Sequence, residues 1–340
     1  MNISLLERLC NAHGVSGYEN EVFDTVIEEI YPYADNIFFD KIGNLIAFKK
    51  GSSSDRKILY SCHADEVGFV INHINPDGTL SFDAIGMSPH VFCGKRVIVG
   101  KNKIPGIIAT KPIHLIPKDE RDKISADDMY IDIGAAKEQV EALSVVSDYA
   151  AFDTAFSCFG KDKILAKALD DRIGCAVACE LIKREHKYDS YFAFCVCEEL
   201  GLRGSHAVAE RIRPDLCINL ESTTANDIPG KSGAEITCVI GAGPVIPFMD
   251  GSAVFDKTLY KKALSLAEQN GIRVQTKTQI AGGTDAASYQ KAGGGIKVFG
   301  IALPTRYIHS CSSVASLSDI ECMMKLACVV SENTDLFIGG

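Results

Sequence analysis

The chain has 340 residues, of which 46% are hydrophobic and 23% charged, and a formal net charge of −9. This length predicts one large domain with a smaller one. No run approaches the ~18 uninterrupted apolar residues of a membrane span, and the acidic balance argues against nucleic acid as a partner. The N-terminus lacks a basic region followed by an apolar core, so we expect no secretion signal and a cytoplasmic protein.

The 13 cysteines do not form the pattern of a disulfide framework. Cys175 and Cys179 lie one helical turn apart, Cys195 and Cys197 alternate along a strand-like run, and no Cys-x-x-Cys pair occurs. An odd count in a large, core-bearing chain fits free thiols in a reducing compartment.

The N-terminal part of the chain predicts helices followed by strands. Apolar residues at three- and four-residue spacing predict helices over 3–12 and 19–31. Polar turns separate the strands expected over 36–40, 45–49 and 57–62. From about 67 to 159, short alternating runs punctuated by Gly and Pro predict an all-β module with one helix over 135–143. Its expected strands include 68–74, 79–82, 96–99 and 104–109.

From residue 163 onward, strands and helices alternate, which predicts an α/β layered sheet with helices on both faces. The expected helices cover 171–183, 205–211, 255–269, 285–291 and 318–332. The expected strands cover 190–196, 215–220, 234–240, 273–275 and 296–301. The simplest architecture is one α/β domain built from residues 1–66 and 163–340, interrupted by a small β domain at 67–162.

Two adjacent glutamates, Glu198 and Glu199, follow the apolar run over 191–196, where we expect a buried strand to leave its sheet. Two like charges resist burial there unless a cation or a proton held at a raised pKa compensates them. A metal hydrolase uses such a pair, because one carboxylate binds the ion while its neighbour takes a proton from the bound water. The alternative is an exposed acidic turn at the start of a helix.

Four other places bring metal-binding side chains to predicted strand ends or turns. They are His63 with Asp65, Asp170 with Asp171, Glu221, and His309. Because strand side chains alternate, Asp65 shares a face with His63 and can hold the far nitrogen of its ring. Each place also has an ordinary explanation, such as helix capping or a solvated turn. Together, at the strand ends where ligands collect in α/β sheets, they have the composition of a site for two divalent ions.

These residues, in this order, resemble the M42 family of metallo-aminopeptidases, also called tetrahedral or glutamyl aminopeptidases. The resemblance covers nearly the whole chain and rests on segments 63–69 (HADEVGF), 168–175 (ALDDRIGC), 198–204 (EELGLRG), 282–286 (GGTDA) and 306–310 (RYIHS). It implies a layered α/β/α, phosphorylase/hydrolase-like catalytic domain with an inserted PDZ-like β barrel for dimerisation. It also implies a peptide substrate and a homo-oligomer, either a dimer or a twelve-subunit tetrahedron.

The resemblance also assigns the metal ligands. One ion is expected on His63, Asp170 and Glu221, and the other on Asp170, Glu199 and His309, with Asp170 shared. Zn²⁺ is the first expectation, while Co²⁺ and Mn²⁺ also suit these donors. The family often has Asp where Glu221 stands, which leaves the metal preference and the spacing open.

The resemblance gives roles to the neighbouring acids as well. Glu198 is expected to be the general base for a metal-bridging hydroxide that attacks the first peptide carbonyl, and to return the proton to the leaving amine. Asp65 is expected to orient His63. The family's peptide bond after the bridging aspartate can be cis, so the bond between Asp170 and Asp171 is a candidate.

The free α-amino group of the peptide also needs a binding site. Gly283, Thr284, Asp285 and Arg306 resemble family positions that line this pocket. Their ordinary alternatives are a tight turn at Gly283 and a helix start at Asp285. The preferred N-terminal residue of the substrate stays open.

Two other functions compete with the peptidase. Paired carboxylates also serve glycoside hydrolysis of the endoglucanase type, which needs no metal and leaves both histidines unexplained. A catalytically inactive peptide-binding assembly protein is the non-enzymatic alternative, and the presence of Glu198 argues against it.

Overall fold

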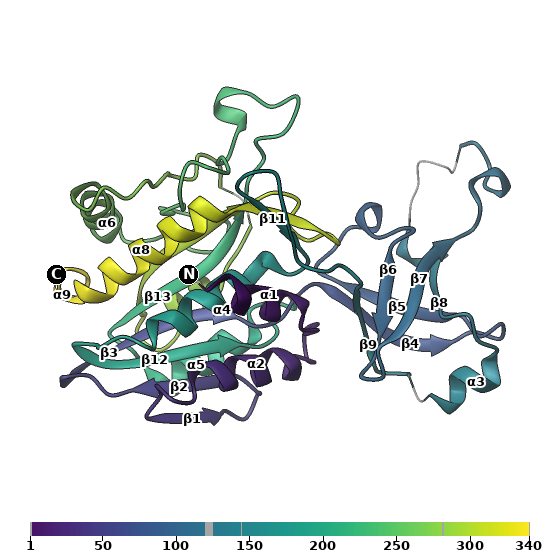
Figure 1. Ribbon diagram of the computed structural model, residues 1–340, viewed down its shortest axis with the longest axis horizontal. Coiled ribbons are helices and arrows are strands. Elements are labelled where there is room, and N and C mark those ends of the chain that lie inside the picture. Colours follow the sequence, from purple (N-terminus) through teal and green to yellow (C-terminus); the bar gives the residue numbers. More distant parts are fainter. Residues whose placement is uncertain (1, 120–124, 144, 281, 340) are drawn as a thin grey trace.

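The protein is described by a computed structural model that covers residues 2–119, 125–143, 145–280 and 282–339. A six-stranded mixed sheet with its helices forms one body, and a closed six-stranded barrel projects from it (Figure 1). Among the described residues, no helix is long and apolar enough to cross a membrane.

The main sheet has the strand order β1-β2-β12-β3-β13-β14. Its strands are β1 (Asn36–Phe39), β2 (Leu45–Lys49), β3 (Ser53–His63), β12 (Tyr188–Cys195), β13 (Leu216–Thr224) and β14 (Lys297–Thr305). The last four run parallel, and Cys195 is in register with His63. Their carboxyl ends therefore meet at one edge of the sheet, which is where ligands bind in open α/β sheets.

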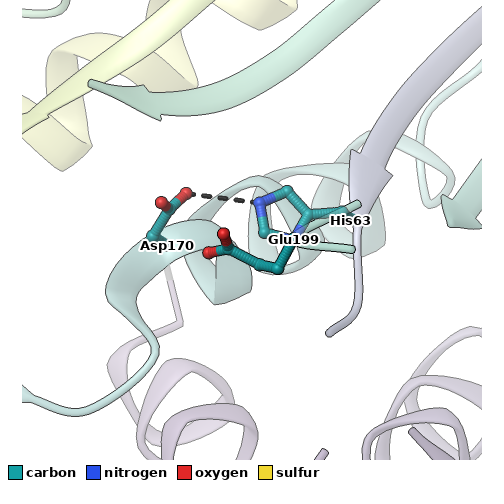
Figure 2. A group of neighbouring side chains, drawn as sticks. All are labelled: His63, Asp170 and Glu199. Atoms are coloured by element: carbon teal, nitrogen blue, oxygen red, sulfur yellow. Dashed lines mark hydrogen bonds and ion pairs between the residues drawn. The ribbon is translucent and has the colours of Figure 1, made fainter. Parts of the chain in front are cut away.

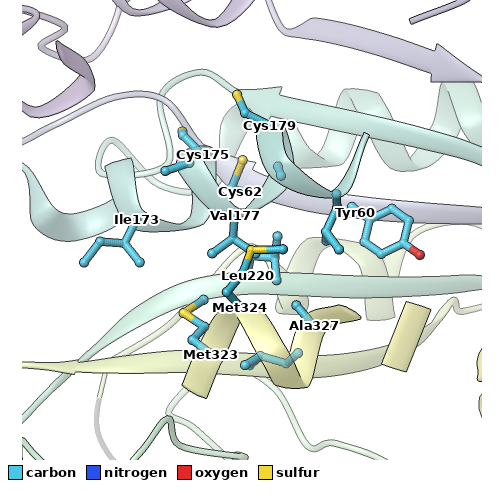
Figure 3. Close-up of a cluster of buried hydrophobic side chains, with 14 of the residues drawn as sticks. Tyr60, Cys62, Ile173, Cys175, Val177, Cys179, Leu220, Met323, Met324 and Ala327 are labelled. Atoms are coloured by element: carbon cyan, nitrogen blue, oxygen red, sulfur yellow. The ribbon is translucent and has the colours of Figure 1, made fainter. Parts of the chain in front are cut away.

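Alternating side chains of the sheet enter two separate cores. Tyr60 and Cys62 of β3 lie in the first core, whereas Leu59 lies in the second. The helices that contribute to the first core are α1 (Ile3–Asn11), α2 (Asn20–Ile30), α4 (Leu169–Leu181), α6 (Lys257–Gln269), α8 (Leu317–Glu332) and α9 (Thr334–Ile338). Those of the second core are α5 (Arg203–Ile212) and α7 (Ala286–Lys291). Figure 3 shows side chains of α4 and α8 meeting those of β3 and β13 in the first core.

The strands of the barrel lie in the chain between β3 and β10 (Ser157–Phe159). Its strands follow the order β4-β5-β8-β7-β6-β9 around the barrel. Their bounds are β4 (Gly68–Ile74), β5 (Leu80–Ile85), β6 (Arg96–Val99), β7 (Ile104–Thr110), β8 (Met129–Asp132) and β9 (Tyr149–Phe152), with α3 (Lys137–Ala142) before β9. Phe69 lies fully buried at its centre, with its ring edge-on to those of Phe82, Phe92 and Phe152.

A small antiparallel sheet supports the α/β body next to the barrel. It consists of β10 (Ser157–Phe159), β11 (Lys163–Ala166) and β15 (Ser313–Ser316), in that order. β11 leads directly into α4, and β15 leads into α8. These strands have no counterpart among the sequence predictions.

The predicted strands over 234–240 and 273–275 are wrong. The first region contains a single 3-10 turn, Gly233–Glu235, and the second forms only an isolated bridge between Val245 and Gln275. Side chains satisfy the backbone in place of a ladder, because the Val239 N–H donates to Gln275 Oε1 and the Ile240 N–H donates to Asp227 Oδ2. Such side-chain acceptors compete with regular strand pairing.

All 13 cysteines are free, as expected. Eight of them are buried, which fits their use as small hydrophobic side chains.

Candidate metal centre

The carboxyl edge of the parallel strands gathers the predicted ligands. His63 ends β3, Glu221 lies near the end of β13, and Glu199 lies in the turn after β12. Asp170 comes from the start of α4, and His309 from the connection between β14 and β15. Figure 2 shows His63, Asp170 and Glu199 converging from these elements.

Asp170 lies between the two histidines and presents one carboxylate oxygen to each. Its Oδ1 is 3.3 Å from His63 Nε2, and its Oδ2 is 3.4 Å from His309 Nε2. A carboxylate in this arrangement can donate one oxygen to each of two neighbouring ions.

Each histidine has a second acidic neighbour, and the ligand atoms of His63, Asp170 and Glu199 all lie within 4.8 Å of one another. Glu221 Oε1 lies 3.4 Å from His63 Nε2, and Glu199 Oε1 lies 3.1 Å from His309 Nε2. Ligands at ~2.0–2.2 Å from a tetrahedral zinc ion are about 3.3–3.5 Å from one another. The four distances from a histidine Nε2 to a carboxylate oxygen, 3.1–3.4 Å, are close to that spacing, so each of these pairs has the separation of two ligands on one divalent ion.

Asp171 makes different contacts from Asp170. Its Oδ1 accepts from the N–H of Gly174, as a capping residue does, and its Oδ2 accepts from the N–H of His63 at 3.3 Å. Helix capping therefore explains Asp171 and leaves Asp170 to face the histidines. The peptide bond between the two is cis, as the family resemblance implies. Asp171 also lies within 4.8 Å of the ligand atoms of His63 and Glu221.

Asp65 is fully buried and contacts several groups at the carboxyl edge of the sheet. His63 Nδ1 lies 3.2 Å from its backbone oxygen and 3.4 Å from its Oδ1. The backbone N–H groups of Glu198 and Glu199 also donate to its carboxylate, at 2.9 and 3.1 Å. Asp65 thus contacts both the ring of His63 and the backbone of the paired glutamates.

The pKa values reflect the excess of acidic groups at this edge. Burial alone would lower the pKa of His309, but Asp170 and Glu199 raise it to about 11. Burial raises the pKa of Glu221 to about 8 and raises that of Glu198 well above its ordinary value. Divalent cations beside such acids stabilise the carboxylate form. The charge of the site therefore fits cations as well as its geometry does.

A small pocket opens beside Glu221. Its lining combines apolar side chains such as Val245 and Phe255 with the polar Asp250 and Thr284. Thr284 Oγ1 donates to Asp250 Oδ2 at 3.1 Å. Of the four predicted pocket residues, Thr284 is the one in this lining.

The other three predicted pocket residues lie outside the lining of this pocket. The positive φ of this turn occurs at Gly282 (+70°) and not at Gly283. Asp285 precedes α7 and is buried, which raises its pKa to about 6, but its side chain makes no capping hydrogen bond. Arg306 forms a two-pronged pair with Asp227, from Nε to Oδ1 at 2.7 Å and from Nη2 to Oδ2 at 2.5 Å.

Two groups around the site have no counterpart in the sequence predictions. Glu66, directly after Asp65, is buried against Lys167 and Arg172. Ser16 donates to Asp65 from a turn between α1 and α2. The Ser-Gly-x-Glu segment at 16–19 is a turn-like signal in the sequence, but nothing in the pattern connects it to residues almost fifty positions away.

Comparison with known proteins places the chain in a family. The family model of the M42 glutamyl aminopeptidases matches residues 43–326. The chain is 30% identical over 334 residues to the lysyl aminopeptidase of Pyrococcus furiosus, covering 95% of this chain and 94% of the relative. The chain belongs to the M42 peptidase family. This membership favours the peptidase interpretation over the glycoside hydrolase.

Solved structures agree with the family assignment. The TET aminopeptidase of a marine sediment Thaumarchaeota archaeon superposes with a TM-score of 0.94 at 36% identity, covering 99% of this chain and 97% of that one. The TET1 peptidase of Pyrococcus horikoshii, described as assembling into a tetrahedron or a large octahedral shell, gives a TM-score of 0.85 at 31% identity. That match covers 97% of this chain and 98% of the relative.

Proposed function

We propose that this protein is an aminopeptidase that uses two divalent metal ions to remove N-terminal residues from peptides. The observation that carries this proposal is the Asp170 carboxylate, which presents one oxygen to His63 and the other to His309. His63, Asp170 and Glu221 would hold one ion. Asp170, Glu199 and His309 would hold the other. Zn²⁺ suits these donors best, and Co²⁺ and Mn²⁺ are alternatives.

Glu198 is the proposed general base. When bound, the ions would polarise the peptide carbonyl and acidify the attacking water. The Glu198 carboxylate takes the proton from that water and gives it to the leaving amine. Its backbone N–H donates to Asp65 Oδ1 at 2.9 Å, which holds the residue at the carboxyl edge of the sheet beside Glu199.

The pocket beside Glu221 is the proposed binding site for the N-terminal side chain of the peptide. Glu221 belongs both to its lining and to the proposed metal site, and its walls combine apolar and polar side chains, as the walls of small-ligand sites do. Thr284 contributes to its lining. Gly283, Asp285 and Arg306 stay as predictions for the recognition of the peptide amino group.

We further propose that residues 1–66 and 163–340 form the layered catalytic domain and that 67–162 form a PDZ-like dimerisation domain. The separate core of the barrel, centred on Phe69, supports this division. Assembly of dimers into a twelve-subunit particle in the cytoplasm is part of the same proposal. The tetrahedral assembly of the related TET1 peptidase supports a large particle, and the 13 free thiols of this chain support a reducing compartment.

The experiment is a panel of aminoacyl-anilide substrates assayed on metal-stripped protein reconstituted separately with Zn²⁺, Co²⁺ and Mn²⁺. We expect hydrolysis of at least one substrate that depends on added metal. Glu28→Gln, at an exposed surface position, is the matched control for Glu198→Gln. Hydrolysis of β-glucans that survives exhaustive chelation, with no anilide turnover, would instead support the glycoside hydrolase.

A further inference from the structure

We propose that Ser16 and Glu19 are positioning residues of the catalytic centre. They hold Asp65 and the backbone of Cys197, and through them the turn that carries Glu198 and Glu199. This inference rests on the proposed function, since it concerns the placement of the proposed base.

A tight turn over residues 15–18 carries Ser16 and leads directly to Glu19, which precedes α2. The Tyr18 N–H donates to the carbonyl oxygen of Val15 at 2.8 Å, and Gly17 at the third position has a φ of +90°. A left-handed third residue is typical of a type II turn and favours glycine there. The turn lies between α1 and α2 and is fixed to the loop after β3, because the Glu66 N–H donates to the carbonyl oxygen of Gly14 at 2.8 Å.

Ser16 completes the hydrogen bonding of Asp65. The Ser16 hydroxyl donates to Asp65 Oδ2 at 2.6 Å, and both side chains are buried. The same oxygen accepts from the Glu199 N–H, while Oδ1 accepts from the Glu198 N–H. A buried carboxylate that loses one donor is free to shift or rotate toward the remaining donors. Any such movement would be passed to His63 and to both glutamates.

Glu19 contacts the backbone of Cys197, the residue directly before Glu198. Its carboxylate accepts from the Cys197 N–H at 3.2 Å and from the Gly17 N–H at 2.8 Å, and the side chain is only 4% exposed. Cys197 has a φ of +54°, which is costly for a residue that is not glycine. This left-handed residue directly precedes Glu198, so the contact from Glu19 supports the backbone conformation that directs the base into the site.

Ser16→Ala tests the first contact in the holoenzyme at saturating metal. We expect kcat for an aminoacyl-anilide to fall about 10–100-fold, as for other residues that orient metal ligands, with KM and bound metal unchanged. Ser190→Ala is the control, because it removes an equally buried hydroxyl at the far end of β12, where Ser190 donates to the carbonyl oxygen of Tyr188. Wild-type kcat in Ser16→Ala, or an equal loss in Ser190→Ala, would overturn the proposal.

A double-mutant cycle separates positioning from general structural support. If Ser16 acts through Asp65, then Ser16→Ala causes no further loss of kcat in an Asp65→Ala background. Losses that multiply independently would overturn the proposal.

The role of Glu19 is tested by comparing the conservative variant Glu19→Gln with Glu19→Ala. Glu19→Gln keeps an oxygen that accepts from Cys197, whereas Glu19→Ala does not, so we expect only the alanine variant to lose kcat. Wild-type kcat in Glu19→Ala would remove Glu19 from the proposal.

Glu198→Gln is assayed in parallel. If it keeps full activity, the proposed base is wrong. If it is inactive while Ser16→Ala is fully active, only the positioning role fails.

Discussion

The buried ion cluster around Glu66 should make a large contribution to stability. Lys167 Nζ lies 2.6 and 2.8 Å from the two carboxylate oxygens of Glu66, and Arg172 Nη2 lies 3.2 Å from one of them. The Gly14 N–H also donates to Glu66, at 3.0 Å. The three charged side chains are at most 2% exposed. Glu66→Gln would leave two buried cations without a counter-ion.

Removing one partner of such a buried group costs about 3–5 kcal/mol. That corresponds to an increase of roughly two to three and a half orders of magnitude in the unfolding equilibrium constant. The matched control is Glu28→Gln, which makes the same substitution in a surface pair with Arg8 whose side chains are 73% and 40% exposed. The control should cost about 0–1 kcal/mol, because solvent screens exposed pairs.

Urea unfolding of the metal-stripped variants measures both losses without a contribution from metal binding. Acid titration adds a second readout. Burial alone would raise the pKa of Glu66, but Lys167 and Arg172 lower it below its ordinary 4.5. Wild-type stability from this group is therefore complete above about pH 4.5 and declines as the pH falls through the lower folded-state pKa, whereas Glu66→Gln lacks that dependence. If Glu66→Gln lowers the free energy of unfolding by no more than Glu28→Gln does, the reasoning is refuted.

Three further predictions concern the site and the barrel. Glu198→Gln should lower kcat about 10²–10⁴-fold with bound metal nearly intact by elemental analysis, and full activity would contradict its role as base. His309→Ala should lose the ion shared with Glu199 while the other stays bound, and full occupancy of both sites would contradict its role as ligand. Phe69→Ala removes a fully buried ring in contact with three others and should destabilise the barrel by about 3–5 kcal/mol, whereas an unchanged urea midpoint would contradict its central place.

The helices and most strands of the α/β body could be predicted from local pattern. The helix expected over 318–332 is α8 (Leu317–Glu332), and the strand expected over 45–49 is β2 (Leu45–Lys49). Both are defined by the spacing of apolar residues, which the chain carries locally. The region over 234–240 has the same kind of apolar spacing but no strand partner, because Asp227 and Gln275 occupy its backbone donors.

The candidate site, too, could be predicted only in part from the sequence. The chemical types of His63, Asp170, Glu199, Glu221 and His309, their order and their places near strand ends were readable from the sequence. The family resemblance then implied how they would be shared between ions. The arrangement of the Asp170 oxygens between two histidines depends on how α4 and the β14–β15 connection pack against the sheet.

The sequence by itself therefore determined the family, the α/β class and the residue types of the site, since these follow from local spacing and motif order. Only the tertiary structure decided which groups hold those residues in place. Ser16 is 49 positions from Asp65, and Glu66 is 101 positions from Lys167. Hydrogen bonds and ion pairs between such distant residues form only when the chain has folded, so no local pattern encodes them.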